Sequence, residues 1–328
     1  MAISVIFVWL ALRGLKLSDV WEAVQHANYL WIVPGVAVYF VAVWARTWRW
    51  HYLLRPLRRV PLGDLFPVVV IGYMGNNIYP ARAGELIRAY VLRRKEDVSV
   101  SASLATIIVE RIFDGIVMLI FVVVALPLAP ALPDWLRRVV VLGTIVFFGA
   151  LIVFLVLASA PQRIATVYNR MVARVIPARL RPGITGILDR FVEGLKSLRS
   201  PLDLLMVFFT SLVIWLTETI KYWFVMQAFP SGGFPVSFFA LLLMNGVVNL
   251  ATTIPSAPGY VGTFDTPGIE ILKVFGVEAA MAAGYTLVLH AALWLPITLL
   301  GAWYLAREGL QWSDFRRAEQ LRQATGQG

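Results

Sequence analysis

Long apolar runs separated by short polar segments organise this 328-residue chain. About six runs lack a polar face, and most reach the roughly 20 residues that cross about 30 Å of hydrocarbon as a helix. A large soluble core would need polar faces on these segments, so the pattern predicts a helical membrane protein. We expect spans over residues 2–12, 29–54, 103–128, 135–157, 202–229 and 279–306.

Two further apolar stretches are shorter and end in proline and glycine. Residues 65–78 lead into "NNIYPARAGELI", and residues 238–254 lead into "PSAPGYVGTFD". Both segments contain the spacing Pro-x-x-x-Gly, in Pro80 with Gly84 and in Pro255 with Gly259. Short, Gly/Pro-interrupted segments at matching positions of two halves indicate an inverted-repeat transporter and its binding site. The predicted fold is therefore an all-α polytopic membrane protein with re-entrant hairpins over about residues 65–94 and 238–275.

Three predicted spans separate the two hairpins. If each hairpin returns to its own side, the two enter the membrane from opposite faces, as an inverted repeat requires. Glycine permits tight turns and close backbone approach, and proline interrupts the helix. We therefore assign hinge roles to Pro80, Gly84, Pro255, Gly259 and Gly262.

The net charge of +10 is unevenly distributed along the chain. One predicted side receives most of the basic residues: the loop with Arg46, Arg49, Arg55, Arg58 and Arg59, the run 93–95, the linker 161–200 and the tail. Such an excess marks cytoplasmic loops that face an anionic leaflet, rather than a nucleic-acid site. We expect one transmembrane domain over residues 1–307, a polar cytoplasmic tail over residues 308–328, and both termini inside.

The residue inventory excludes several kinds of chemistry. The chain has no cysteine, and its three histidines lie far apart in the sequence. Disulfides, thiolate metal sites and cysteine nucleophiles are therefore excluded. The sequence shows no P-loop, zinc-protease motif, serine-hydrolase elbow or dinucleotide-binding glycine pattern. We expect no metal, no cofactor and no enzymatic activity.

We call the Pro/Gly interruptions at residues 80–84 and 255–259 the first and second breaks. The first break contains the candidate residues with the clearest chemistry. Pro80 suits the first turn of a helix, which would begin inside the membrane with unpaired amides and a positive dipole end. Such an end binds phosphate readily. Arg82, Glu85 and Arg88 are spaced three apart on one face, so Glu85 can neutralise one arginine and leave a positive charge for one phosphate. The alternative is a salt-bridged helix that snorkels to the cytoplasmic interface.

Charges inside the span over residues 103–128 extend this site. Glu110 and Asp114 are four apart beside Arg111, and intramembrane charges indicate a functional site by default. One of these carboxylates is expected to pair with an arginine of the first hairpin, and the two could also share a proton. The alternative is a static network that locks the hairpin to this span. We assign substrate binding to Asn76, Asn77, Arg82, Arg88 and Arg111.

The second half offers weaker candidates. Glu218 and Lys221 are three apart, a spacing that favours mutual neutralisation. Asp265 or Thr266 is expected to cap the helix after the second break, with Pro267 just inside it, and capping is the structural role expected of Asp265. His290 is expected to make a helix–helix hydrogen bond, with proton relay as the alternative. Charge balance or proton coupling is assigned to Glu85, Glu110, Asp114, Glu218, Lys221 and Asp265.

The segments "GNNIYPARAGELIRAYVLRRK", "SLATIIVERIFDGI" and "PSAPGYVGTFD" resemble motifs of the lysylphosphatidylglycerol synthase transmembrane region family, also called flippase-like domain proteins. The resemblance covers about residues 16–307, and Asp265 stands where the commoner family form has glutamate. It implies an integral inner-membrane protein that moves or handles lipids. In the multiple peptide resistance factor, a similar region flips aminoacylated phosphatidylglycerol and is joined to a soluble synthase. The tail after Arg307 is too short for a synthase, so aminoacyl transfer is not expected.

The expected function is translocation of a phosphate-bearing lipid, either a phospholipid or a polyprenyl-phosphate carrier, between leaflets of a bacterial or archaeal inner membrane. Head groups would bind between the hairpins and be exposed to each leaflet in turn. One alternative is an integral membrane enzyme that acts on lipid phosphates. Another is a scaffold that recruits a lipid-modifying enzyme or glycosyltransferase through the basic linker. The expected partners are membrane lipids and no nucleic acid, and a homo-oligomer is compatible with the pattern.

Overall fold

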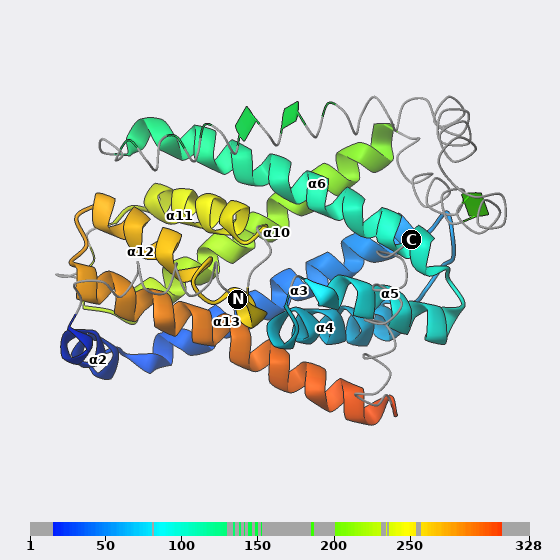
Figure 1. Cartoon of the computed structure of the whole chain (residues 1–328), viewed down its shortest axis with the longest axis horizontal. Helices are drawn as coiled ribbons and strands as arrows, with labels where there is room; N and C mark the ends of the chain where they lie inside the picture. Colours follow the sequence, from blue (N-terminus) through cyan, green and yellow to red (C-terminus); the bar gives the residue numbers. More distant parts are fainter. Residues whose placement is uncertain are drawn as a thin grey trace, which may run out of the picture.

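The computed structural model describes residues 16–80, 82–129, 201–230, 234, 236–253 and 257–309, with isolated positions between 134 and 186. Every regular element in these residues is a helix, which confirms the all-α class (Figure 1). The α-helices are α2 (Leu17–Gln25), α3 (Ile32–Leu54), α4 (Leu62–Ile78), α5 (Ala83–Glu96), α6 (Val100–Ala125), α10 (Pro201–Gln227), α11 (Phe238–Ala251), α12 (Asp265–Val274) and α13 (Ala279–Arg307). The short 3-10 helices are η1 (Tyr29–Trp31), η2 (Leu126–Leu128) and η5 (Pro258–Tyr260).

Three helical stretches of the described chain are long and apolar enough to cross a membrane: Tyr29–Leu54, Leu202–Gln227 and Ala279–Arg307. They coincide with predicted spans. Helix α6 has 26 residues and carries the charged cluster around Glu110 in its middle. The predicted spans over 2–12 and 135–157, the linker 161–200 and most of the tail lie outside the described residues, so the total span count stays a prediction.

Both broken segments form pairs of short helices that pack against each other, α4 with α5 and α11 with α12. In the first pair Gly72 lies against Arg88 and Gly75 against Gly84, so α4 and α5 run antiparallel as a helical hairpin. The prediction that Pro80 starts the second helix is wrong, because α5 begins at Ala83. Tyr79 before the proline is extended (ψ 147°), and Arg82 adopts a left-handed conformation (φ 56°) that completes the reversal of the chain.

In each half of the molecule, one hairpin helix packs on a long helix of the other half, which we call exchanged packing. Helices α3 and α10 are antiparallel, with contacts that run from Gly35 beside Phe224 to a 2.7 Å hydrogen bond from the Tyr52 hydroxyl to Asp203. Hairpin helix α4 packs on α13, and its counterpart α11 packs on α6 (Figure 1). Likewise α5 packs on α6, and α12 packs on α13. Each hairpin therefore contacts both α6 and α13, and the antiparallel α3–α10 pair is the relation that an inverted repeat requires.

The buried apolar side chains form two clusters, one on each side of the molecule. One cluster gathers residues of α10–α13 and the end of α6, and the other gathers residues of α3–α5 and the start of α6. Leu293 of α13 packs against both clusters and also lines a polar cavity. The fold thus positions buried polar groups where its two apolar halves meet.

Candidate functional site

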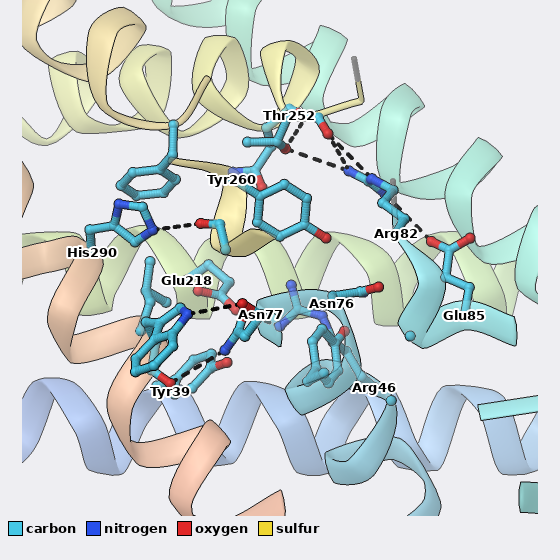
Figure 2. Close-up of a pocket in the computed structure, with 18 of the residues that line it drawn as sticks. Tyr39, Arg46, Asn76, Asn77, Arg82, Glu85, Glu218, Thr252, Tyr260 and His290 are labelled. Atoms are coloured by element: carbon cyan, nitrogen blue, oxygen red, sulfur yellow. Dashed lines mark hydrogen bonds and ion pairs between the residues drawn. The ribbon is translucent and has the colours of Figure 1, made fainter. Parts of the chain in front are cut away.

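A cavity of about 140 Å³ lies where the two hairpin breaks approach each other (Figure 2). Its walls come from α3, α4, α5, α6, α10, α11, η5 and α13. Five cationic and two acidic side chains line it: Arg46, Arg82, Arg88, Arg111, Lys221, Glu85 and Glu218. Such a surplus of positive charge in a semi-enclosed cavity favours an anionic ligand.

Arg82 connects the two breaks. Its Nε and Nη2 donate hydrogen bonds of 3.3 and 3.2 Å to the carbonyl oxygen of Thr252, at the C-terminal end of α11. Its guanidinium lies 5.5 Å from the ring centre of Tyr260, and its Nη1 lies 3.5 Å from Glu85 (Figure 2). Arg82 is therefore already engaged across the hairpins, which makes it a latch as well as a candidate phosphate ligand.

Arg88 is the most distinctive cation of the cavity. Its side chain is buried, with Nη1 at 2.8 Å from Glu110 Oε2 and the guanidinium 3.5 Å above the ring of Trp50. Its Nε and Nη2 have no hydrogen-bond partner among the described residues. A buried polar group normally finds a partner, so these two nitrogens are candidates for binding an anion in the cavity.

An ion-pair chain joins the first hairpin to α6 and α3. Arg111 lies 3.7 Å from Glu85 and 3.1 Å from Asp114. Arg49 of α3 donates a 2.6 Å hydrogen bond to Asp114 and lies 3.7 Å from Glu110. The expected pairing between a carboxylate of this span and an arginine of the first hairpin is therefore present, as Arg88 with Glu110. The network also fixes Arg88 and Arg111 in place.

A second cluster lies on α3 and α10. Glu218 forms ion pairs with both Arg46 and Lys221, so the expected mutual neutralisation of Glu218 and Lys221 is only part of the arrangement. Aromatic rings flank both cations: Trp215 lies 4.8 Å from Arg46, and Tyr39 lies 4.8 Å from Lys221. Glu218 serves two cations, so this cluster keeps a net positive charge.

The prediction from the distribution of basic residues that Arg46 and Arg49 lie in a cytoplasmic loop is wrong. Both residues lie within α3 and are buried, at 6% and 1% exposure. The uninterrupted apolar run 29–54 contains the signal that identifies them, because an arginine inside a span indicates a site and a partner. With them, the ion pairs in and beside the cavity, among the described residues, involve six cations and four carboxylates.

The asparagines mostly join helices. Asn77 donates a 2.8 Å hydrogen bond to Thr298 of α13, whereas Asn76 lines the cavity and its Oδ1 has no hydrogen-bond partner among the described residues. Asn245 donates to Thr219 of α10 at 2.9 Å, and Asn249 donates to Asn245 at 2.7 Å. Both asparagines of the predicted pair therefore line the cavity, and the side chain of Asn77 is already hydrogen-bonded to α13.

Asp265 does not cap α12 as predicted. It is the first residue of that helix, after Phe264, and its side chain turns back to accept the Gly262 N–H at 2.8 Å and to face His290 at 2.7 Å. The contact with Asp265 of α12 is the expected helix–helix hydrogen bond of His290, and the second ring nitrogen lies 2.7 Å from the Gly259 carbonyl oxygen. His290 also lines the cavity (Figure 2).

The predicted hinge residues have different backbone roles. Gly259 (φ 66°) and Gly262 (φ 85°) adopt left-handed conformations that favour glycine. Gly84 is helical and permits close approach of α4. Pro255 lies outside the described residues, and the hinge roles stay predictions. Within the described part of the chain, no group of three His, Asp or Glu side chains is arranged to hold a metal ion.

Comparison with known families places this geometry in context. The family model described as the lysylphosphatidylglycerol synthase TM region matches residues 1–301. The chain belongs to this family. The resemblance of the three motifs is thereby confirmed, and the apolar helices are those of a membrane protein family.

Curated relatives of this family are distant but match along most of this chain. A UPF0104 membrane protein of Methanothermobacter thermautotrophicus is 24% identical over 92% of this chain and 90% of its own length. A UPF0104 membrane protein of Methanocaldococcus jannaschii is 21% identical over 91% of each chain. Glycosyltransferase AglD of Haloferax volcanii is 27% identical over 82% of this chain, which spans only 47% of that relative. No solved structure matches the chain significantly.

The Arg46–Glu218–Lys221 cluster allows an asymmetric stability test. Replacing Glu218 by glutamine leaves two cations buried without their counterion, which is expected to cost about 3–5 kcal/mol. Replacing Lys221 by methionine leaves Glu218 paired with Arg46 and is expected to cost much less. Thermal unfolding of the purified protein, followed by tryptophan fluorescence, measures both. Equal losses in the two variants would contradict the arrangement.

Proposed function

We propose that this chain translocates a phosphate-bearing lipid, a phospholipid or a polyprenyl-phosphate carrier, between the leaflets of the inner membrane. The observation that carries the proposal is the positive excess between the two breaks, together with the two unpartnered guanidinium nitrogens of Arg88. A charge buried in this way is costly unless it is paired. A lipid phosphate supplies the missing negative charge.

The cavity matches a head group rather than a whole lipid. Its volume of about 140 Å³ has room for a phosphate and a small polar substituent, while the hydrocarbon chains would remain in the bilayer. Glu85, Glu110 and Asp114 hold Arg88 and Arg111 in place. With Arg49 and Arg82 counted, this cluster has four arginines and three carboxylates, so a positive charge remains. The lipid is therefore attracted by fixed donors that require little rearrangement on binding.

The exchanged packing of the two halves supports an alternating mechanism. Each hairpin packs on a long helix of the other half, and Arg82 joins the breaks through Thr252 and Tyr260. Opening this latch on one side while the equivalent contacts close on the other would expose the cavity to each leaflet in turn. In this mechanism both termini face the cytoplasm and the chain performs no bond chemistry.

Reconstituted vesicles test the proposal directly. Tail-labelled phosphatidylglycerol is expected to move between leaflets faster in protein-containing vesicles than in empty ones, as measured by dithionite bleaching of the outer leaflet. A tail-labelled monoglucosyl diacylglycerol, which lacks phosphate, is the matched probe and is expected to move at the rate of empty vesicles. Added polyprenyl phosphate should compete with the labelled phosphatidylglycerol if it is the preferred lipid. Equal acceleration of both labelled lipids would contradict phosphate recognition.

A scaffold function is the second candidate, and the similarity to AglD favours it. That relative is named a glycosyltransferase, and this chain covers 47% of it, so transferase activity is not transferred to this chain. A membrane region that holds a lipid carrier beside a separate glycosyltransferase would account for the positively charged cavity and for the similarity to AglD. In that case vesicles containing this chain alone would not accelerate any labelled lipid, and a copurifying transferase would depend on it for activity.

A further inference from the structure

His290 of α13 faces hydrogen-bond acceptors with both ring nitrogens. Nδ1 lies 2.7 Å from Asp265 Oδ1, and Nε2 lies 2.7 Å from the carbonyl oxygen of Gly259. A neutral imidazole carries one N–H and one lone pair, so it can satisfy only one of two acceptors. The geometry therefore requires one proton more than a neutral histidine and an ionised aspartate carry between them.

The surroundings place that proton on the histidine. Asp265 Oδ2 accepts the Gly262 N–H at 2.8 Å, and Asp265 is the first residue of α12, where the helix dipole favours a negative charge. An ionised Asp265 then accepts from Nδ1–H, and the Gly259 carbonyl accepts from Nε2–H. The resulting imidazolium joins two elements of the second hairpin to α13.

We propose that His290, Asp265 and the Gly259 carbonyl form a proton-binding site whose occupancy holds the second break against α13. This site goes beyond lipid recognition, because its protonation does not depend on which lipid, if any, enters the cavity. Its protonation would nevertheless affect the cavity, since His290 and Gly259 both line it.

Loss of the proton would weaken the contact between η5 and α13. One ring nitrogen would then present a lone pair to an oxygen 2.7 Å away, which is repulsive. The more weakly held partner is the Gly259 carbonyl, since Asp265 can accept the remaining N–H. Tyr260 follows Gly259 and stacks beneath Arg82, so release of this carbonyl would loosen the latch between the two breaks.

Other titratable and charged groups surround the site from each element that packs on α13. Those on the cavity side are Tyr39, Arg46, Tyr73, Arg82, Glu85, Arg88, Arg111, Glu218, Lys221, Tyr222 and Tyr260. Helix α12 also carries the exposed pair Glu270 and Lys273, and α2 presents Asp19, Glu22 and His26 near Glu278. Among the described residues, the ring nitrogens of His290 contact Asp265 and Gly259, so the proposed site is local to this group.

Replacing Asp265 by asparagine separates protonation from packing. The amide oxygen can still accept the Gly262 N–H, and the amide N–H₂ can donate to Nδ1 of a neutral His290, which keeps its Nε2–H for Gly259. Asp265→Asn therefore preserves every hydrogen bond of the site and removes its need for a proton. Glu270→Gln, on the same helix but paired with Lys273, is the matched control.

Nitrogen-15 NMR of histidine-labelled protein in nanodiscs measures the protonation state. The chain has three histidines, and His290→Gln assigns the signal by its disappearance. The measurement is made at a pH of about 7, within the range in which imidazoles titrate. We expect both ring nitrogens of His290 to be protonated in the wild type and in Glu270→Gln. In Asp265→Asn we expect only one of them to be protonated. A neutral His290 in the wild type under these conditions would overturn the proposal.

Spin labels measure the mechanical consequence. Because the chain has no cysteine, Val261→Cys and Leu299→Cys introduce a single labelled pair, at positions that are 44% and 66% exposed. We expect a longer inter-label distance to appear in the wild type as the pH rises and His290 loses its proton, and no such change in the Asp265→Asn background. Identical pH dependence in both backgrounds would overturn the coupling. Neither readout involves lipid movement, so failure here is distinguishable from failure of the proposed translocation.

Discussion

Replacing Arg88 by glutamine is expected to lower the rate of protein-dependent phosphatidylglycerol movement by roughly ten- to a hundredfold. Arg88 lines the cavity and has a buried guanidinium with two unpartnered nitrogens, and hydrogen bonds to a charged group contribute about 1.5–3 kcal/mol. Each 1.4 kcal/mol corresponds to a factor of ten in rate or affinity. The dithionite assay in vesicles measures the loss directly.

The same change also removes a partner of Glu110, so its effect on stability needs a separate variant. In Arg88→Gln/Glu110→Gln both charges of the 2.8 Å pair are absent, which avoids leaving a buried carboxylate with reduced compensation. We expect the double variant to regain thermal stability but not lipid movement. Arg58→Gln is the control, because that arginine is half-exposed and pairs with Glu96. Wild-type movement in the folded double variant would contradict the role of Arg88 in lipid binding.

The helices of the fold are largely predictable from the sequence. The apolar runs predict α3, α6, α10 and α13 to within a few residues, because membrane burial depends on local composition. The repeated Pro-x-x-x-Gly breaks predict two short-helix pairs at matching positions of two halves. Their exchanged packing agrees with the inverted repeat that this pattern indicates.

The starting points of the hairpin helices are not predictable from the breaks alone. Proline suits the first turn of a helix, but Pro80 lies in the connection and Arg82 completes the turn with a left-handed backbone. Antiparallel packing of α4 and α5 requires the chain to reverse before the helix resumes, and that requirement is tertiary. Asp265 shows the same limit, because a cap depends on local geometry, whereas the observed contact depends on His290, distant in sequence.

The candidate site is partly predictable, because a charge inside an apolar run is visible in the local sequence, whereas its partner is not. Charges of the first hairpin, α6 and α10 identify eight of the ten charged residues of the site: Arg82, Glu85, Arg88, Glu110, Arg111, Asp114, Glu218 and Lys221. Arg46 and Arg49 are wrongly assigned to a cytoplasmic loop, although both lie inside the apolar run 29–54 and an arginine inside a span indicates a buried site. Their partners, Glu218 and Asp114, lie 172 and 65 residues away, so only the packing of α3 on α10 and α6 reveals them.

Replacing Gly84 by alanine is expected to destabilise the protein by more than about 3 kcal/mol, the upper end of ordinary overpacking. A Cβ at this position would lie 1.9 Å from the Gly72 carbonyl oxygen and 2.5 Å from the Asn76 backbone nitrogen. Both atoms belong to the backbone of α4, so no side-chain rotation relieves the contact. Helix α5 would have to move away from α4 and would carry Arg88 with it. Thermal unfolding followed by tryptophan fluorescence, combined with the vesicle assay, measures both effects.

Gly63 provides the matched control on the same hairpin. It is a helical residue of α4, and a Cβ there would meet nothing within 4 Å. Alanine is the better helix former by up to about 1 kcal/mol, so helix propensity alone predicts that both substitutions stabilise the protein. Opposite signs at the two positions would isolate the close approach of α4 and α5 as the cause. Similar small effects at both would mean that the hairpin tolerates separation of its helices, and that Arg88 is not held in place by this packing.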